Sequence, residues 1–152
     1  MPRILLLDPD PERSQKLAFL LRHSGFFVDL GEGGMGGTAL LRRTEPDMVL
    51  VAEHCPTLQD RQAARLVFRL FEDVPKIVLG EEREEVAGIP YLDMGADAYL
   101  PRPINTRVLL ARIRSMLYRF ERKRQGGSDR QPDSLPYGDT SGMMTGRGAR
   151  TA

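Results

Sequence analysis

The sequence contains a single cysteine, Cys55, among its 152 residues. One thiol cannot form an internal disulfide, so the sequence predicts a reducing compartment. Net charge is also nearly absent, because 22 Lys and Arg residues face 21 Asp and Glu residues and leave +1. This balance argues against a protein that binds polyanions through bulk charge.

Long hydrophobic runs are missing as well. No apolar segment approaches the roughly 20 residues that a membrane-spanning helix needs. The apolar run near the N-terminus, Ile4–Leu7, is short and is followed at once by the carboxylate of Asp8, which is not the pattern of a signal peptide. We therefore expect a cytoplasmic protein with no membrane partner.

The composition changes near residue 123. The segment 123–152 contains six glycines and two prolines, and Leu135 is its only branched aliphatic residue. Such a segment cannot bury enough apolar area to offset the entropy lost on ordering. The sequence therefore predicts one domain over residues 1–122 and a disordered tail or linker over 123–152.

Short apolar runs alternate with amphipathic segments throughout the first 122 residues. Runs of this kind are typical of strands buried on both faces. We expect strands at Ile4–Leu7, Phe26–Leu30, Met48–Val51, Ile77–Leu79 and Ala98–Leu100. We expect helices capped by Asp10 and by Asn105, and further helices at Thr38–Thr44, Arg61–Phe71 and Glu84–Met94. This alternation predicts an α/β fold whose functional crevice lies at the carboxyl ends of parallel strands.

Four segments of the sequence resemble the receiver domain of bacterial two-component response regulators. They are Ile4–Glu12, Pro46–Val51, Gly95–Pro103 and Leu109–Arg114. The resemblance covers residues 3–119. It implies a flavodoxin-like, doubly wound parallel sheet in the order 2-1-3-4-5 with helices on both faces.

The same resemblance implies a phosphorylation pocket. Receiver domains hold Mg²⁺ with an acidic pair after the first strand and phosphorylate an Asp that ends the third strand. Here Asp8 matches the first acid, but the second falls on Pro9, which has no side-chain oxygen, and the acceptor falls on Ala52. The pocket therefore lacks the nucleophile and one expected metal ligand.

Other family positions are also altered. The Thr or Ser that ends the fourth strand is Gly80, and the Lys that follows the fifth strand is Arg102. The aromatic switch residue is retained as Tyr99, and Pro103 is in place for a cis peptide bond. Arginine keeps the charge of lysine but not the geometry of a compact ammonium group.

Two neighbouring carboxylates are possible substitutes for the missing groups. Glu53 follows Ala52, but adjacent side chains on a strand point to opposite faces, so we expect Glu53 to be turned away from the pocket. Asp10 could replace Pro9 as a metal ligand, but it is also the expected helix cap. The sequence therefore predicts no metal, no cofactor and no aspartyl phosphorylation. A loop rearrangement that brings Glu53 or Asp10 into use is the alternative.

Three other local features have either two alternative interpretations or no predicted function. Asp8 and Arg102 are expected to face one another across the pocket, either as a fixed ion pair or as independently solvated charges. His54 and Cys55 have no metal-site spacing and are interpreted as incidental loop residues. The glycine-rich segment Gly31–Thr38 lacks the lysine of a phosphate-binding loop and is interpreted as a flexible connection.

A set of charged residues and a segment of the tail indicate how the protein contacts its partners. Asp97, Arg112, Arg114 and Arg119 resemble the face through which winged-helix response regulators dimerise. The resemblance implies a protein partner or a homodimer through the face formed by the fourth helix, the fifth strand and the last helix. The segment Leu135–Asp139 resembles the strand that opens their DNA-binding domain. We therefore expect a non-enzymatic pseudo-receiver that acts by protein contact or dimerisation. The alternative is the receiver half of a DNA-binding regulator, which would contact nucleic acid only through a missing C-terminal domain.

Overall fold

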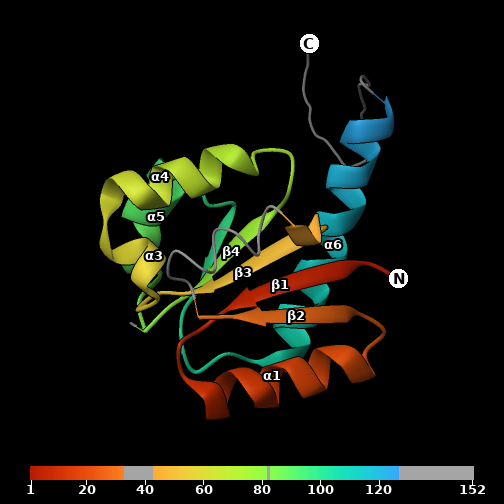
Figure 1. Cartoon of the computed structure of the whole chain (residues 1–152), viewed down its shortest axis with the longest axis horizontal. Coiled ribbons are helices and arrows are strands. Elements are labelled where there is room, and N and C mark those ends of the chain that lie inside the picture. The colour runs from red at the N-terminus through yellow and green to blue at the C-terminus, as the bar shows by residue number, and fades with distance from the viewer. Residues whose placement is uncertain (33–42, 82, 127–152) are drawn as a thin grey trace, which may run out of the picture. The chain divides into compact units, whose positions relative to one another are not determined.

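A five-stranded parallel sheet forms the centre of the computed structural model, which describes residues 1–32, 43–81 and 83–126. The strand order is β2-β1-β3-β4-β5, as the resemblance implied (Figure 1). The strands are β1 (Arg3–Leu7), β2 (Phe27–Gly31), β3 (Met48–Ala52), β4 (Lys76–Leu79) and β5 (Ala98–Leu100). Each expected strand is present to within one residue at either end.

Helices cover both faces of this sheet. They are α1 (Pro11–His23), α3 (Pro56–Gln59), α4 (Arg61–Leu70), the 3₁₀-helix η1 (Glu85–Gly88), α5 (Ile89–Met94) and α6 (Thr106–Gly126). Helices α1 and α6 contribute to the core on one face, and α3, α4 and α5 pack on the other (Figure 1). This layering encloses an apolar core on each side of the sheet.

Alternate side chains of β1 enter the two cores. Leu6 packs with Leu21 of α1 and Ile113 of α6, whereas Leu5 packs with Phe68 of α4 on the opposite face. All four named leucine and phenylalanine side chains are at most 2% exposed. Each such burial contributes about 1.5–3 kcal/mol, so the two cores fix the ends of the strands from which the site is built.

Three helices begin at residues whose side chains accept hydrogen bonds from the first turn. Asp10 accepts from the amides of Glu12 and Arg13, at 3.1 and 3.2 Å. Asp60 caps α4 in the same way, and Asn105 caps α6. These caps satisfy amides that have no partner within the helix. The predicted capping roles of Asp10 and Asn105 are confirmed.

Some helical predictions differ from the structure. The buried residues of α1 are Ser14, Ala18 and Leu21. The small side chains of Ser14 and Ala18 allow the helix to approach the sheet closely, while Leu17 and Leu20 are only partly buried. The predicted helix Glu84–Met94 is divided into η1 and α5 near Gly88, where its sequence is weakest.

The C-terminal prediction is tested only in part. Helix α6 continues through Gly126, four residues past the expected domain boundary at 122. The rest of the predicted tail, 127–152, lies outside the described residues, as do most of the predicted helix Thr38–Thr44 and most of the glycine-rich segment. The chain divides into two compact units, Met1–Leu117 and Tyr118–Ala152. Within the described ranges, none of the helices has the length and apolar character needed to cross a bilayer.

Candidate functional site

Five charged or polar side chains meet at the carboxyl edge of the sheet, and we call them the Asp8 network. Asp8 follows β1 and Arg13 lies in the first turn of α1. His54, Glu81 and Arg102 follow β3, β4 and β5, respectively. Parallel strands bring these positions to one edge, which is where such folds bind ligands.

Asp8 is buried and is held by Arg13 through two hydrogen bonds. Arg13 Nε donates to Asp8 Oδ2 and Nη2 donates to Oδ1, both at 2.9 Å, and the amide of Asp10 also donates to Oδ1. Burial alone would raise the pKa of Asp8, but the bonds from Arg13 and Asp10 outweigh it and lower that pKa. The hydrogen bond to Asp8 in turn raises the pKa of Arg13. A fixed guanidinium therefore neutralises the acid that the resemblance assigned to a metal.

Glu81 is the second centre of the network. Its Oε2 atom lies 2.9 Å from His54 Nδ1, 3.4 Å from Arg13 Nη1 and 3.3 Å from Arg102 Nε. Arg13 Nη2 lies 2.6 Å from His54 Nε2. These contacts are all satisfied if His54 carries its proton on Nδ1, donates it to Glu81 and accepts from Arg13 at Nε2.

The Asp8–Arg102 ion pair, one of the two alternatives that the sequence left open, is not formed. Arg13 occupies both oxygens of Asp8, so Arg102 pairs with Glu81 instead. His54, interpreted as incidental, belongs to the network, and Arg13 and Glu81 were missed. A signal for Arg13 was available, because helical side chains lean towards the helix N-terminus, where Asp8 lies. Nothing in the local sequence marks Glu81, which the fold brings from a distant segment.

Glu53 makes a separate contact with the switch aromatic. Tyr99 Oη donates to Glu53 Oε1 at 2.9 Å, and Tyr91 Oη donates to Oε2 at 3.0 Å. The amide of Glu81 also donates to Oε1, at 2.7 Å. Burial, with the hydrogen bond to Glu53, raises the pKa of Tyr91 to about 12. The Glu53 carboxylate is thus engaged by the tyrosines of α5 and β5.

Two glycines make room for the buried Tyr99 ring. A Cβ atom at Gly80 would collide with the Tyr99 hydroxyl, and one at Gly88 would collide with the ring near Cγ. Tyr91 stacks nearby, with ring centroids 6.0 Å apart and planes at 3°. We call Glu53, Tyr91, Tyr99 and the two glycines the Tyr99 network. The absence of a side chain at Gly80, read from the sequence as a lost hydroxyl, is also what admits Tyr99.

The remaining pocket residues do not fit a magnesium site. Pro9 supplies no side-chain oxygen, Ala52 ends β3 with a buried methyl group, and Asp10 accepts helix amides. In the described part of the chain, no three His, Cys, Asp or Glu side chains gather in a way that could hold a metal ion. The Arg102–Pro103 peptide bond is cis, as predicted. Cys55 is buried, and burial raises the pKa of its thiol.

Two of the predicted dimer-face residues make contacts within the described part of the chain. Asp97, which precedes edge strand β5, accepts from the Lys76 amide at 2.8 Å and pairs with its Nζ at 3.2 Å. Arg114 lies over the ring of Phe26, which precedes the opposite edge strand, β2. The buried stripe of α6 consists of Leu109, Ile113 and Met116. At 100° per residue, Arg112 and Arg114 lie on opposite sides of this stripe. Arg119 belongs to the second compact unit.

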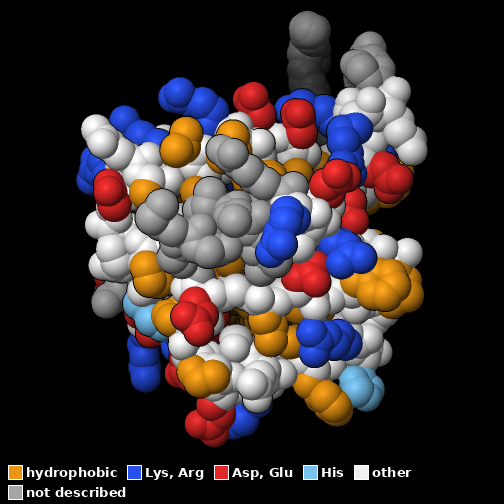
Figure 2. Space-filling view, viewed as in Figure 1, with side chains coloured by type: hydrophobic (Ala, Val, Ile, Leu, Met, Phe, Trp, Pro, Cys, Tyr) orange, Lys and Arg blue, Asp and Glu red, His pale blue; other side chains and the backbone are white. Residues whose placement is uncertain are grey.

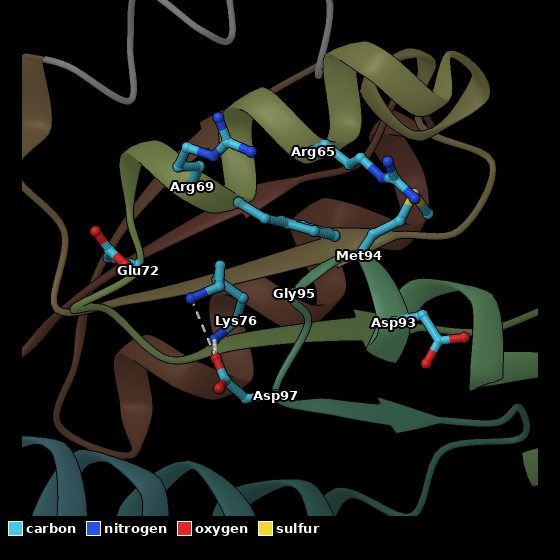
Figure 3. A pocket seen from close by; sticks show the side chains of 9 residues that line it. Arg65, Arg69, Glu72, Lys76, Asp93, Met94, Gly95 and Asp97 are labelled. Atoms are coloured by element: carbon cyan, nitrogen blue, oxygen red, sulfur yellow. Dashed lines mark hydrogen bonds and ion pairs between the residues drawn. The ribbon is translucent and has the colours of Figure 1, made fainter.

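A separate pocket of about 420 Å³ lies at the amino ends of β4 and β5. The Lys76–Asp97 pair lines it, with Arg65 and Arg69 extending from α4 and Glu72 and Asp93 at its sides (Figure 3). Its charges are mixed, so it has no evident preference for a ligand of either sign. Acidic and basic side chains are also interspersed over the face shown in Figure 2, in keeping with the small net charge.

Comparison with known proteins finds response regulators among the proteins similar to this chain. No protein-family profile matches the chain. The response regulator MprA of Mycobacterium sp. (strain KMS) is 34% identical over 135 residues, which cover 87% of this chain and 55% of that protein. The DNA-binding response regulator MtrA of Mycolicibacterium smegmatis is 33% identical over 138 residues, which cover 90% of this chain and 57% of that protein. The chain thus spans about half the length of these relatives.

Solved structures give the same fold. A CheY-like receiver domain protein from Methanospirillum hungatei superposes with a TM-score of 0.73 at 24% identity, covering 81% of this chain and 98% of that one. The receiver domain of Francisella response regulator 1452 gives a TM-score of 0.70 at 20% identity, covering 78% and 98%. The chain is therefore a homologue of response regulators, and its five-stranded sheet with flanking helices has the fold of receiver domains.

Proposed function

We propose that this receiver-type domain is a regulatory module that works through protein contacts without being phosphorylated. One observation carries the proposal: the carboxylates that could replace the missing acceptor or metal ligand already accept hydrogen bonds from the protein. Asp8 accepts from Arg13, Asp10 from helix amides, and Glu53 from two tyrosines. Phosphoryl transfer needs a positioned nucleophile and a cation to neutralise the transferred group, and both roles lack a free residue.

Glu53 gives this module a fixed conformation at its switch residue. The carboxylate holds the hydroxyl of Tyr99 inside the protein, so the position of Tyr99 does not depend on a phosphoryl group. The partner surface that we propose lies on the same side of the sheet, at η1 and α5. There Val86, Ile89 and Leu92 are 61%, 49% and 42% exposed. We propose that this surface meets a second copy of the chain or another protein.

Intact mass spectrometry tests the absence of phosphorylation. The wild type and Glu53→Gln are incubated with a small acyl phosphate and Mg²⁺, and we expect neither protein to gain a phosphoryl group. Glutamine keeps an acceptor for Tyr99 but has no carboxylate to phosphorylate. A phosphoryl adduct on the wild type that is lost in Glu53→Gln would overturn the proposal and establish Glu53 as a substitute acceptor.

A second candidate is the receiver half of a DNA-binding regulator. Its support is the relative named a DNA-binding response regulator, of which this chain covers 57%. That alignment covers 90% of the chain, so it includes part of the sequence beyond Gly126, since residues 1–126 make up less than nine-tenths of it. Sequencing the reading frame downstream of Ala152 tests this candidate: a winged-helix domain supports it, and a stop codon contradicts it. A non-enzymatic role without a cofactor is part of both proposals.

A further inference from the structure

We propose that the exposed face of α4 is an interaction surface, and that its partner is the acidic surface of η1 and α5 on a second copy of the chain. The proposal rests on the protein contacts proposed above and deepens them, because it commits the η1 and α5 surface to one partner. The basic surface of α4 consists of Arg61, Arg65, Leu66, Arg69 and Leu70. The acidic surface consists of Glu84, Glu85, Val86, Ile89, Leu92 and Asp93.

The first observation is that the two surfaces carry equal and opposite charges. Helix α4 contains three arginines and no acidic residue, whereas residues 84–94 contain three acidic residues and no lysine or arginine. All six charged residues are exposed. Within the described ranges, none of them forms an ion pair. Complementary charges of this kind steer two surfaces together and disfavour wrong partners.

The second observation is that each set of charges lies beside exposed apolar side chains. Leu66 and Leu70 of the basic surface are 56% and 43% exposed. At 100° per residue, Leu66 lies between Arg69 and Leu70 on the outward side of α4. The acidic surface exposes Val86 and Ile89 in the same way. Apolar side chains surrounded by charged ones are the usual composition of a contact between proteins.

The third observation is that the two surfaces border the same pocket. Arg65 and Arg69 extend into it from α4, and Asp93 lines it from α5 (Figure 3). Helices α4 and α5 also contact one another directly. A two-fold axis repeats every contact in reverse, so each copy offers the same two surfaces to the other. An axis near this pocket therefore brings the arginines of each copy to the acids of its partner.

The ends of α4 favour this partner over a nucleic acid or a membrane. Asp60 precedes the helix, and Glu72 and Asp73 follow it, so acids bound the basic surface at both ends. A phosphate backbone or an anionic bilayer would meet these acids as well as the arginines, and the net charge of the chain is only +1. A short acidic surface avoids this repulsion, and the chain itself supplies one.

Exchange of charge between the two surfaces gives a specific test. The α4 variant is Arg65→Glu/Arg69→Glu, and the α5 variant is Glu85→Lys/Asp93→Lys. In a dimer of either variant alone, like charges face one another in both contacts. In a mixed dimer the two reversed surfaces meet in one contact, and the two unchanged surfaces meet in the other. Both contacts of the mixed dimer are then complementary.

Sedimentation equilibrium of the whole chain measures these dimers, with circular dichroism confirming the fold of each variant. We expect each variant alone to dimerise with a dissociation constant raised about tenfold or more, because like charges replace opposite ones. We expect an equimolar mixture to dimerise nearly as well as the wild type. Added salt should weaken the wild-type dimer, because it screens exposed charges. If the α4 variant unfolds, Arg65→Gln/Arg69→Gln replaces it and should weaken the dimer to a smaller extent.

The matched control places the same change of net charge on the other face of the sheet. It is Arg107→Glu/Arg112→Glu, at two exposed positions of α6. We expect the control to dimerise like the wild type. Its mixture with the α5 variant should dimerise less well than the mixture of the α4 and α5 variants, because one of the two contacts still opposes like charges.

Four outcomes overturn the proposal. They are a wild type that stays monomeric, a dimer that the α4 or neutral variant does not weaken, equal recovery in the two mixtures, and loss of the dimer in the control alone. Equal recovery would show attraction between net charges only, and loss in the control alone would place the contact at α6. None of these results adds a phosphoryl group to the protein, so the proposed function is tested separately by the intact mass.

Discussion

The position of the Tyr99 side chain depends on two glycines that leave space for its ring. Its ring occupies space that a Cβ atom at Gly80 or Gly88 would fill, and its hydroxyl reaches Glu53. Neither glycine has a positive φ, so neither is required by backbone conformation. Their role is to leave room. The position of the switch residue is therefore set by packing as well as by the hydrogen bond.

Substitution of Gly80 tests this packing. Gly80→Ala should lower the free energy of unfolding by about 1–3 kcal/mol, because overpacking forces Tyr99 or the backbone to move. In a Tyr99→Leu background the shorter side chain leaves room, and the same substitution should cost much less. Urea denaturation of the four proteins measures this coupling. Equal costs in both backgrounds would show that Tyr99 is not what excludes a side chain at position 80.

Tyr91 gives a second prediction, in alkaline solution. Its pKa is raised from 10.0 to about 12 in the folded protein, so the unfolded chain loses the proton first as the pH rises. The stability that this hydroxyl contributes is complete below pH 10 and is lost between pH 10 and about 12. Tyr91→Phe should therefore weaken the pH dependence of the unfolding free energy in this interval.

Phenolate absorbance provides the direct readout for Tyr91. The chain has four tyrosines and no tryptophan, so the ultraviolet titration reports tyrosines alone. The wild type should show a tyrosine that ionises near pH 12 and is missing from Tyr91→Phe. If the variant loses a tyrosine that ionises near pH 10 instead, the contact between Tyr91 and Glu53 does not persist in solution.

At the scale of elements, the Asp8–Arg13 pair fastens the start of α1 to the end of β1. The two hydrogen bonds are 2.9 Å long and the Asp8 side chain is 2% exposed. A second pair, Arg3–Asp29, joins β1 to β2 at the same distance, but its side chains are 41% and 30% exposed. These two ion pairs therefore allow the stability contribution of a buried pair to be compared with that of an exposed pair.

Removal of each acid should give different losses of stability. Asp8→Ala should lower the free energy of unfolding by about 2 kcal/mol at neutral pH, as for hydrogen bonds to a charged group. Asp29→Ala should cost at most about 1 kcal/mol, as for an exposed pair. Chemical denaturation measures both. Similar losses for the two variants would contradict the special role of Asp8.

The pH dependence of the Asp8→Ala effect follows from the lowered pKa of Asp8. The contribution of the carboxylate is fully present above its unfolded pKa of 3.8 and is lost as the pH falls through the lower folded value. The stability difference between the wild type and Asp8→Ala should therefore be constant near neutrality and narrow below pH 3.8. A difference that grows on acidification would show that burial dominates the pKa of Asp8.

The strands could be predicted because each contains a short apolar run, which only Asp29 in β2 interrupts, and the caps because Asp10 and Asn105 precede helical segments. Helix α3 has only four residues and leaves no periodic pattern. Lys76 was missed because a lysine at the start of a strand is expected to be exposed, whereas here it bonds the carbonyls of Phe71 and Val74. The site was harder, since Tyr99 and Glu53 are 46 residues apart and only the fold joins them.

At the scale of the molecule, the two faces of the sheet differ in what they present to a partner. The side of η1 and α5 exposes Val86, Ile89 and Leu92 close in sequence, whereas α1 on the other face exposes Phe19, at 64%. A symmetric dimer needs a self-complementary surface, and an apolar patch meets this need without paired charges. The η1 and α5 surface, which corresponds to the fourth helix of the predicted face, is therefore our candidate for the homodimer contact.

Sedimentation equilibrium tests the homodimer. We expect the wild type to interconvert between monomer and dimer as its concentration rises, and Ile89→Asp to remain monomeric because a charge would be buried at the contact. Phe19→Asp, an equally drastic change on the opposite face, should leave the equilibrium unchanged. A wild type that stays monomeric at every concentration contradicts the homodimer. Loss of the dimer in Phe19→Asp but not in Ile89→Asp would move the interface to α1.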